Sequence, residues 1–87
     1  MSDLLSFSPS RIVIYSTERC PDCRRASAFF EAHEIPHLKV SIEANAEAMQ
    51  FVAAINHGYH SVPTIIFPDG SILVEPSLEE LKAKLGA

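Results

Sequence analysis

The sequence predicts a small α/β domain in which a four-stranded mixed sheet is flanked by three helices. Short apolar runs alternate with longer stretches whose apolar residues recur at helical spacing, in the order strand–helix–strand–helix–strand–strand–helix. The run Ile12–Tyr15 is continuously apolar and mostly β-branched, as in a strand covered on both faces, hence central or parallel. The turn Pro68–Gly70 joins the last two strands as an antiparallel hairpin, so the sheet is expected to be mixed.

The first strand, residues 11–16, leads to the only two cysteines of the chain, which stand in the sequence Cys20-Pro-Asp-Cys23. Pro21 suits the first position of a helix, where its missing N–H costs nothing, so Cys20 is expected at the N-cap. The helix then continues as an amphipathic stretch and breaks at Ile35-Pro36. The cysteine pair is therefore predicted to open the first helix, just after a buried strand.

The remaining elements follow from the same patterns and from signals at their ends. They are a second strand (37–42), a helix that starts after Asn45 and ends at Gly58, a third strand (64–67), a fourth strand (71–74) and a last helix after Ser77. Ser77 and Glu80 have the spacing of a capping box, in which each side chain binds the other residue's backbone N–H. Leu78, Leu81 and Leu85 of that helix are expected to face the sheet.

Length and composition limit the possible classes of function. Eighty-seven residues form one domain, for which we expect an N-terminal lead-in over 1–10 and the folded domain over 11–87. The formal charge of −4, from 7 basic and 11 acidic residues, argues against nucleic acid or an anionic membrane as a partner. No apolar run approaches the roughly 20 residues of a membrane span, and 1–10 lacks the pattern of a secretory signal. We therefore expect a monomeric cytoplasmic protein.

Two cysteines three residues apart cannot cross-link distant parts of the chain, so we expect a local role in a reducing compartment. A strand that feeds a C-x-x-C at the start of a helix has the geometry of thiol–disulfide exchange. The free N–H groups and the positive end of the helix favour the thiolate of Cys20, whose pKa is expected to lie below about 8.5. Cys20 is thus the predicted nucleophile, and Cys23, one turn inside the helix, is the predicted resolving thiol.

Three charged side chains flank the predicted nucleophile. Arg19 and Arg24 would add to the stabilisation of a thiolate, whereas the carboxylate of Asp22 opposes it. We expect the helix end to dominate, because Asp22 at the second helical position can turn towards solvent.

Metal binding is the main alternative for the cysteine pair. His57 and His60 would complete a Cys2His2 zinc set, but the intervening segment is far longer than the finger spacing of about 12 residues. Further alternatives are an iron–sulfur cluster that bridges a dimer, which the stiff turn at Pro21 disfavours, and a redox-regulated binding module without turnover. The two histidines and Tyr59 otherwise belong to a loop that is either solvated or lines a thiol-binding groove. Redox chemistry without a bound metal is the preferred interpretation.

The stretch Ser61–Thr64 allows two interpretations. A proline at the start of a strand donates no hydrogen bond, so Pro63 marks a strand entry or an edge. Alternatively, its peptide bond is cis and presents the backbone of Val62 for pairing with a substrate peptide. The physical arguments for the two are evenly balanced.

Four segments together resemble the glutaredoxins, with the closest similarity to the mycoredoxin and NrdH-like members. They are Tyr15–Arg25, Ser61–Thr64, Phe67–Gly70 and Pro76-Ser77, in the family's order and approximate spacing. The resemblance extends over nearly all of 11–87 and implies a thioredoxin fold with a cis Pro63. It also implies that Cys20 is the nucleophile and Cys23 the resolving cysteine.

The residues expected to bind the substrate are Arg19, Pro21, Asp22, Val62, Pro63 and Ser77. Of these, the resemblance implies Val62, Pro63 and Ser77, with Ser77 and Leu78 beside the thiol-binding groove. We expect no tightly bound cofactor and a low-molecular-weight thiol as co-substrate. This chain departs from glutathione-type members at Asp22, where those often carry an aromatic residue, and at Asp69–Ser71 and Glu75–Ser77, where those carry a Gly-Gly-x-Asp run. It also has Thr17 and Arg19 where lysine and tryptophan are frequent. We therefore expect mycothiol, bacillithiol, glutathione or the flavoprotein thioredoxin reductase as electron source, and disulfide-containing proteins as substrates.

Overall fold

The computed structural model describes residues 3–86 and has four strands and three helices in the predicted order. The strands are β1 (Ile12–Ser16), β2 (His37–Ser41), β3 (Thr64–Ile66) and β4 (Ile72–Val74). The helices are α1 (Pro21–Ala32), α2 (Ala46–Ile55) and α3 (Leu78–Leu85). Each strand is confirmed and is one residue shorter than predicted, because the hydrogen-bonded ladder is shorter than the apolar run. Across 3–86, no helix has the length and apolar character that crossing a bilayer requires.

The strands form one mixed sheet in the order β2–β1–β3–β4, so β1 is central, as its apolar run predicted. β1 runs parallel to β2 and antiparallel to β3, and β3 and β4 form the predicted antiparallel hairpin. Tyr15 near the end of β1 pairs with Thr64 at the start of β3. The segment after β1 and the segment before β3 therefore lie at the same end of the sheet.

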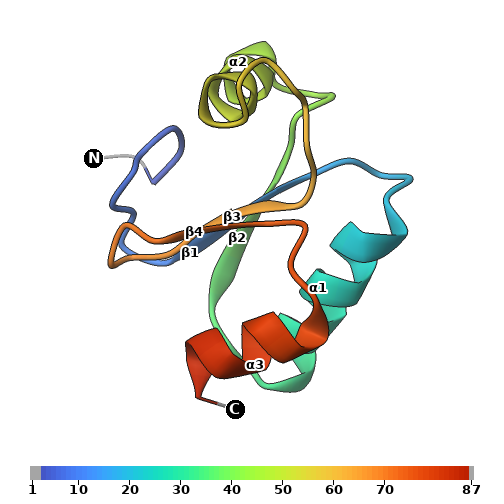
Figure 1. The fold of residues 1–87 in the computed structure, drawn as a ribbon, viewed down its shortest axis with the longest axis vertical. Helices are drawn as coiled ribbons and strands as arrows, with labels where there is room; N and C mark the ends of the chain where they lie inside the picture. Colours follow the sequence, from blue (N-terminus) through green and yellow to red (C-terminus); the bar gives the residue numbers. More distant parts are fainter. Residues whose placement is uncertain (1–2, 87) are drawn as a thin grey trace.

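Helices cover both faces of the sheet, with α2 on one side and α1 and α3 on the other (Figure 1). Alternate residues of β1 point to opposite faces. Ile12 and Ile14 accordingly join the apolar cluster on the α1 and α3 side, whereas Val13 and Tyr15 join the cluster on the α2 side. The fully buried ring of Phe30 belongs to the first cluster and holds α1 against the sheet.

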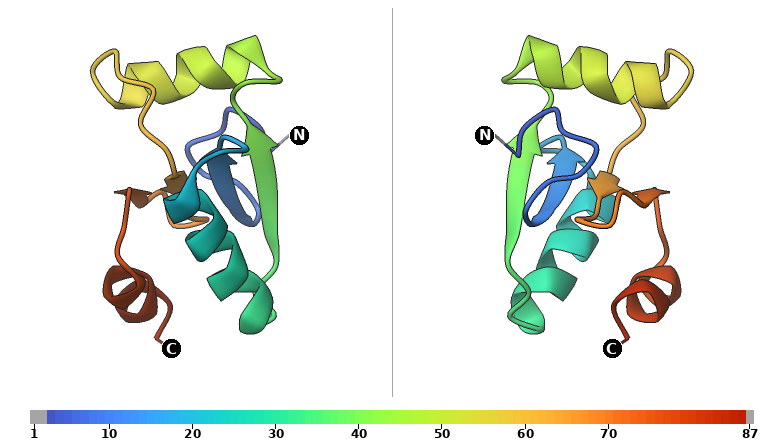
Figure 2. Two further views of the ribbon diagram at one scale, coloured as in Figure 1. Left: turned by 90° about the vertical axis from the view of Figure 1, so that its right-hand side faces the viewer. Right: turned by 90° about the vertical axis from the view of Figure 1, so that its left-hand side faces the viewer.

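The described part of the N-terminal segment, residues 3–10, lies on the α2 side of the sheet (Figure 2). The Leu5 N–H donates to the hydroxyl of Tyr15 at 3.0 Å, and the ring of Phe7 lies 4.9 Å from that of Phe51. Tyr15 is buried, and this burial raises the pKa of its hydroxyl above the ordinary value. These contacts attach the segment to the domain, while the first two residues of the predicted lead-in lie outside the described part.

The predicted starts of the second and third helices are confirmed. The side chain of Asn45 accepts the Ala48 N–H at 3.0 Å and so caps α2. Ser77 and Glu80 form the complete capping box that opens α3. The local side-chain pattern at both places was sufficient to locate the helix start.

Two predictions about helix residues are corrected. The residue that directly follows the C-cap of α2 is His57, with φ of 57°, and Gly58 is the second residue after it, with φ of 95°. The Gly58 N–H donates to the Ala53 carbonyl at 2.7 Å, the bond that the second residue after the C-cap makes in a Schellman motif, so the helix ends one residue earlier than predicted. Leu78 is 37% exposed and is not buried against the sheet as predicted. It lies at the first position of α3, one turn before the buried Leu81, where the end of the helix leaves its side chain partly open to solvent.

Candidate active site

The two cysteines lie where the chain passes from β1 into α1. Cys20 is the N-cap residue, as predicted, and its Sγ accepts a hydrogen bond from the Cys23 N–H at 3.1 Å. The two sulfurs are joined in a disulfide, with Cα atoms 5.1 Å apart. Cys20 is half-buried, whereas Cys23 is fully buried. Of the two sulfurs, that of Cys20 is therefore the one that a dissolved disulfide can reach.

The loop before β3 approaches the same sulfur. The Val62-Pro63 peptide bond is cis, so the cis interpretation of this stretch is the observed one. The carbonyl oxygen of Val62 lies 3.8 Å from Sγ of Cys20, a residue 42 positions earlier in the chain. The pairing of β1 with β3 explains this approach, because it brings the end of one strand beside the start of the other. The two motifs that the sequence singled out thus meet at one place.

A buried hydrogen-bond network lies directly behind this loop. The hydroxyl of Thr64, a fully buried residue, donates to the Ser61 carbonyl at 2.7 Å and accepts from the side-chain amide of Asn56 at 3.1 Å. The same amide donates to the Val52 carbonyl at 3.0 Å, within α2. The network ties the loop to the end of α2. Sequence reasoning missed it, and its one signal was a threonine at the start of an otherwise apolar strand.

Thr64→Val should lower the free energy of unfolding by about 1–3 kcal/mol. Valine keeps the shape, but it leaves the partly buried Ser61 carbonyl and one Asn56 N–H without their partner. Urea denaturation measures the loss. Thr17→Val, the same change at a half-buried position outside the network, should change stability by less than about 0.5 kcal/mol. Equal effects of the two substitutions would show that the network has no role.

The charged side chains near the N-cap sulfur are partly paired. Asp22 is exposed, and its carboxylate accepts a hydrogen bond from the Arg25 guanidinium at 2.8 Å, so it turns towards solvent as predicted. Arg24 donates to the Glu18 carbonyl at 3.0 Å, and Arg19 is exposed. Besides its bond to the Cys23 sulfur, the Cys20 sulfur contacts two backbone groups, the Cys23 N–H and the Val62 carbonyl. The prediction that the helix end favours a thiolate at this position is consistent with the N–H contact.

The turn before α3 also reaches the cis-proline loop. The Glu75 N–H donates to the Pro63 carbonyl at 2.8 Å and so continues the β3–β4 ladder by one bond. Ser77 follows two residues later, but its hydroxyl is used by the helix, where it accepts the Glu80 N–H at 3.1 Å. Sequence reasoning assigned no contact to Glu75, because only the sheet register places it opposite the loop.

The histidines do not join the cysteines. His57, Tyr59 and His60 are exposed in the loop after α2. Within residues 3–86, no group of three or more His, Cys, Asp or Glu side chains is placed to hold a metal ion. The fold therefore does not assemble the Cys2His2 set that the sequence left open.

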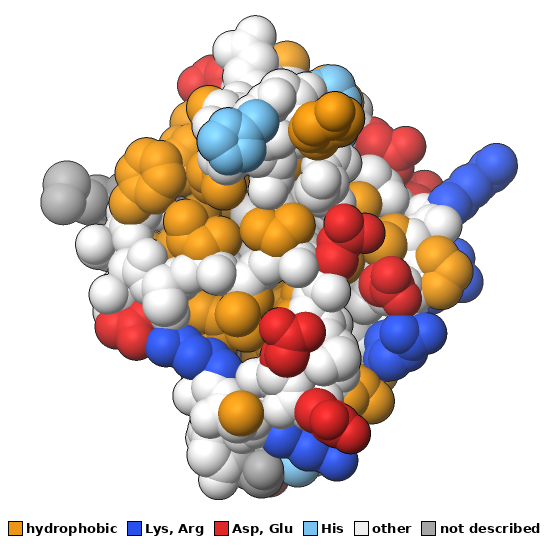
Figure 3. All heavy atoms as spheres, viewed as in Figure 1, with side chains coloured by type: hydrophobic (Ala, Val, Ile, Leu, Met, Phe, Trp, Pro, Cys, Tyr) orange, Lys and Arg blue, Asp and Glu red, His pale blue; other side chains and the backbone are white. Residues whose placement is uncertain are grey.

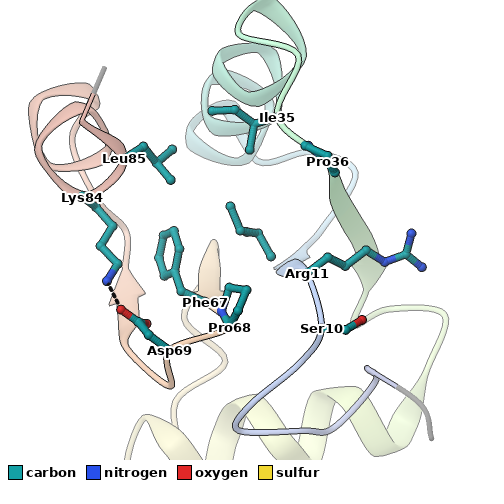
Figure 4. A pocket seen from close by; sticks show the side chains of 10 residues that line it. Ser10, Arg11, Ile35, Pro36, Phe67, Pro68, Asp69, Lys84 and Leu85 are labelled. Atoms are coloured by element: carbon teal, nitrogen blue, oxygen red, sulfur yellow. Dashed lines mark hydrogen bonds and ion pairs between the residues drawn. The ribbon is translucent and has the colours of Figure 1, made fainter.

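A cavity of about 460 Å³ lies at the opposite end of β1, between the start of that strand and α3 (Figure 4). Its walls include Ile35 and Phe67, and the ion pair between Lys84 and Asp69, 2.6 Å long, lies at its edge. The hydrogen bond from Lys84 holds the pKa of the Asp69 carboxyl well below its usual range. The cavity includes neither cysteine nor the cis-proline loop, so the chemistry lies at the other end of the sheet.

The family model for glutaredoxins matches residues 12–72, which is more than half of the chain. The chain belongs to the glutaredoxin family. This glutaredoxin is 43% identical over 74 residues to a protein of Mycobacterium tuberculosis that bears a glutaredoxin name, covering 85% of this chain and 88% of the relative. It is also 31% identical over 78 residues to mycoredoxin 1 of Corynebacterium glutamicum, covering 90% of this chain and 96% of the relative.

The predicted thioredoxin fold of this glutaredoxin is confirmed by comparison with solved structures. A crystal structure of a thioredoxin-like protein matches it with a TM-score of 0.77 at 21% identity, covering 88% of this chain and 96% of that one. Family membership, together with a dithiol pair at disulfide distance, makes the protein a thiol–disulfide oxidoreductase of the glutaredoxin type, as predicted.

Proposed function

We propose that this glutaredoxin reduces disulfides between proteins and a low-molecular-weight thiol, with Cys20 as nucleophile and Cys23 as resolving cysteine. The arrangement of the pair supports the proposal. The half-buried sulfur of Cys20 accepts the Cys23 N–H at 3.1 Å and lies 3.8 Å from the Val62 carbonyl. A sulfur at a helix N-terminus is favoured as the thiolate, which is the attacking form. Cys23 is fully buried and close enough to form the disulfide.

The reaction proceeds by two exchanges of thiol and disulfide. The Cys20 thiolate attacks one sulfur of the mixed disulfide, its electron pair forms the new S–S bond, and the other sulfur leaves as a thiolate that takes a proton from water. The Cys23 thiolate then attacks the Cys20 sulfur and releases the first thiol, or a second thiol molecule attacks the sulfur of the bound thiol, forms a disulfide with it and frees the Cys20 thiolate. The route through Cys23 yields the disulfide seen in the structure. Two thiols of the donor, or a flavoprotein reductase, return the two electrons.

Substrate binding is proposed along the cis-proline loop. The backbone of Val62, next to Pro63, is proposed to pair with the peptide-like part of the bound thiol. The residues proposed at the rim are Arg19, Pro21, Asp22 and Ser77, all of them exposed. We propose that the protein acts as a monomer in the cytoplasm, without a tightly bound cofactor.

The electron donor is proposed to be mycothiol, bacillithiol, glutathione or thioredoxin reductase. Similarity to mycoredoxin 1 and the replacement of an aromatic residue by Asp22 make mycothiol the first to test. The decisive experiment offers the four donors in parallel, each regenerated by an NADPH-coupled reductase, with a cysteine-containing peptide in mixed disulfide with the matching thiol. Turnover above the uncatalysed rate is expected with at least one donor. Absence of turnover with all four would disprove the proposal.

A further inference from the structure

Glu75 has an unusual backbone conformation next to the dithiol site. It is exposed and lies between β4 and α3, with φ of 49°, in the left-handed region that glycine adopts most readily. Its N–H donates to the Pro63 carbonyl at 2.8 Å. The carbonyl of the preceding residue, Val62, lies 3.8 Å from Sγ of Cys20. Glu75 is therefore joined by its backbone to the loop that approaches the Cys20 sulfur.

Three other non-glycine residues among those described have similar φ values: Leu5, with φ of 62°, lies in the N-terminal segment that its N–H fixes to Tyr15, and the other two follow helices. Glu34, with φ of 53°, and His57, with φ of 57°, each follow a helix C-cap. After α1, the Glu34 N–H donates to the Glu31 carbonyl and the Ile35 N–H to the Phe30 carbonyl, which is the hydrogen-bond pattern of a Schellman motif. Glu75 ends no helix. A non-glycine residue held in this region beside a reactive group suggests a functional reason for its side chain.

The negative charge of the Glu75 carboxylate is also not paired with a positive charge among the described residues. The acidic group closest to the cysteines in sequence, Asp22, is paired with Arg25 at 2.8 Å, and Glu80 is used by the capping box. Among the described residues, the Glu75 carboxylate makes no hydrogen bond or ion pair. Figure 3 shows acidic and basic side chains side by side over the right-hand part of this face, where Figure 1 places the first turns of α1 and α3. Glu75 therefore contributes a net negative charge on the α3 side of the site.

We infer that Glu75 is a specificity-determining residue that selects against thiols and disulfides with carboxylates near the sulfur. The preferred co-substrate is a low-molecular-weight thiol that is neutral or cationic around its reacting end. The inference rests on the proposed function, in which Cys20 is the attacking sulfur. The physical cause is Coulomb repulsion, which at low salt changes the rate of a singly charged reagent by about twofold for one unit charge about 10 Å away.

Alkylation with a matched pair of reagents tests the charge directly. Iodoacetate and iodoacetamide both transfer a methylene-linked group to the Cys20 thiolate and release iodide, and they differ in one negative charge. Any change in the thiolate fraction affects both rates equally, so the ratio of the iodoacetate rate to the iodoacetamide rate isolates repulsion of the incoming anion. The reduced protein is alkylated at about 0.01 M and about 1 M salt, where screening is weak and strong, and Cys20 is followed by peptide mass spectrometry.

Glu75→Gln should raise this ratio by about twofold at low salt and leave it unchanged at high salt. Glu75→Asp keeps the charge and should retain the wild-type ratio. Glu34→Gln is the matched control, because it removes the same charge from an exposed glutamate of similar φ at the other end of α1. A ratio unchanged in Glu75→Gln, or raised equally in Glu34→Gln, would overturn the inference.

A second experiment tests the effect of the Glu75 charge on reaction with disulfides, the proposed class of substrate. The rate at which the Cys20 thiolate forms a mixed disulfide is compared for neutral bis(hydroxyethyl) disulfide and anionic dithiodipropionate. The preference for the neutral compound should fall about twofold or more in Glu75→Gln and stay at the wild-type value in Glu34→Gln. An unchanged preference would overturn the inference. Failure of the proposed function would show differently, as absent turnover with every donor while the alkylation ratio still responds to Glu75.

Discussion

Cys20→Ser is expected to abolish disulfide reduction by this glutaredoxin, with a loss of at least about 10³-fold, as is typical when a nucleophile is removed. A serine hydroxyl is almost entirely protonated at neutral pH and cannot form the S–S bond on which each exchange depends. Cys20 carries the half-buried sulfur that accepts a helix N–H, so no other group in the site can take its place. The measurement is turnover of a mixed disulfide with whichever of the four donors supports turnover of the wild type, at enzyme concentrations for which the wild-type rate is well above the uncatalysed rate.

Cys23→Ser is the matched control, since it makes the same atomic change three residues away. Cys23 is fully buried, so its thiol acts only after Cys20 has reacted. Activity that survives in Cys23→Ser indicates a monothiol route in which a second donor molecule forms a disulfide with the first and frees the Cys20 thiolate. Loss of activity indicates a dithiol route through the disulfide between the two cysteines. Substantial turnover by Cys20→Ser would contradict the assignment of the nucleophile.

The elements of the fold could be predicted because their signals are local. A continuous apolar run marked β1 as the central strand, and its five residues are all buried. Pro21 after Cys20 located the start of α1, and the Ser77–Glu80 spacing located the start of α3. Each signal depends on residues within one helical turn or one strand, where periodicity, proline geometry and side-chain capping are sufficient evidence.

The hydrogen bonds that hold the cis-proline loop could not be predicted, because they join residues that only the sheet register brings together. The contact of Asn56 with Thr64, and that of Glu75 with Pro63, depend on how α2 and β4 meet the start of β3. The sequence around Glu75 resembles an ordinary turn, and its left-handed backbone leaves no local trace. Family resemblance pointed to Pro63 as cis, whereas the physical arguments alone left that bond undecided.

Phe30→Ala is expected to lower the free energy of unfolding by about 3–5 kcal/mol, a large part of the roughly 5–15 kcal/mol that stabilises a small domain. Phe30 has no exposed surface and lies in the cluster between α1 and the sheet, with its ring 5.1 Å from that of His37. Its removal leaves a cavity beneath the helix that carries both cysteines. Thermal unfolding should show a fall in Tm of more than about 10 °C.

Phe7→Ala is the matched control, because it removes the same aromatic ring from an exposed position. Phe7 is 56% exposed and contacts Phe51 at the edge of the domain, so its removal should cost less than about 1.5 kcal/mol. If the two variants lost equal stability, α1 would not depend on its buried face.

The helix α1 also presents the Cys23 N–H to the Cys20 sulfur, so loosening its attachment in Phe30→Ala should slow alkylation of Cys20 at neutral pH in the molecules that remain folded. Phe7→Ala should leave the rate of Cys20 alkylation unchanged. This difference between the two variants would show that the reactivity of the N-cap sulfur depends on the packing beneath α1.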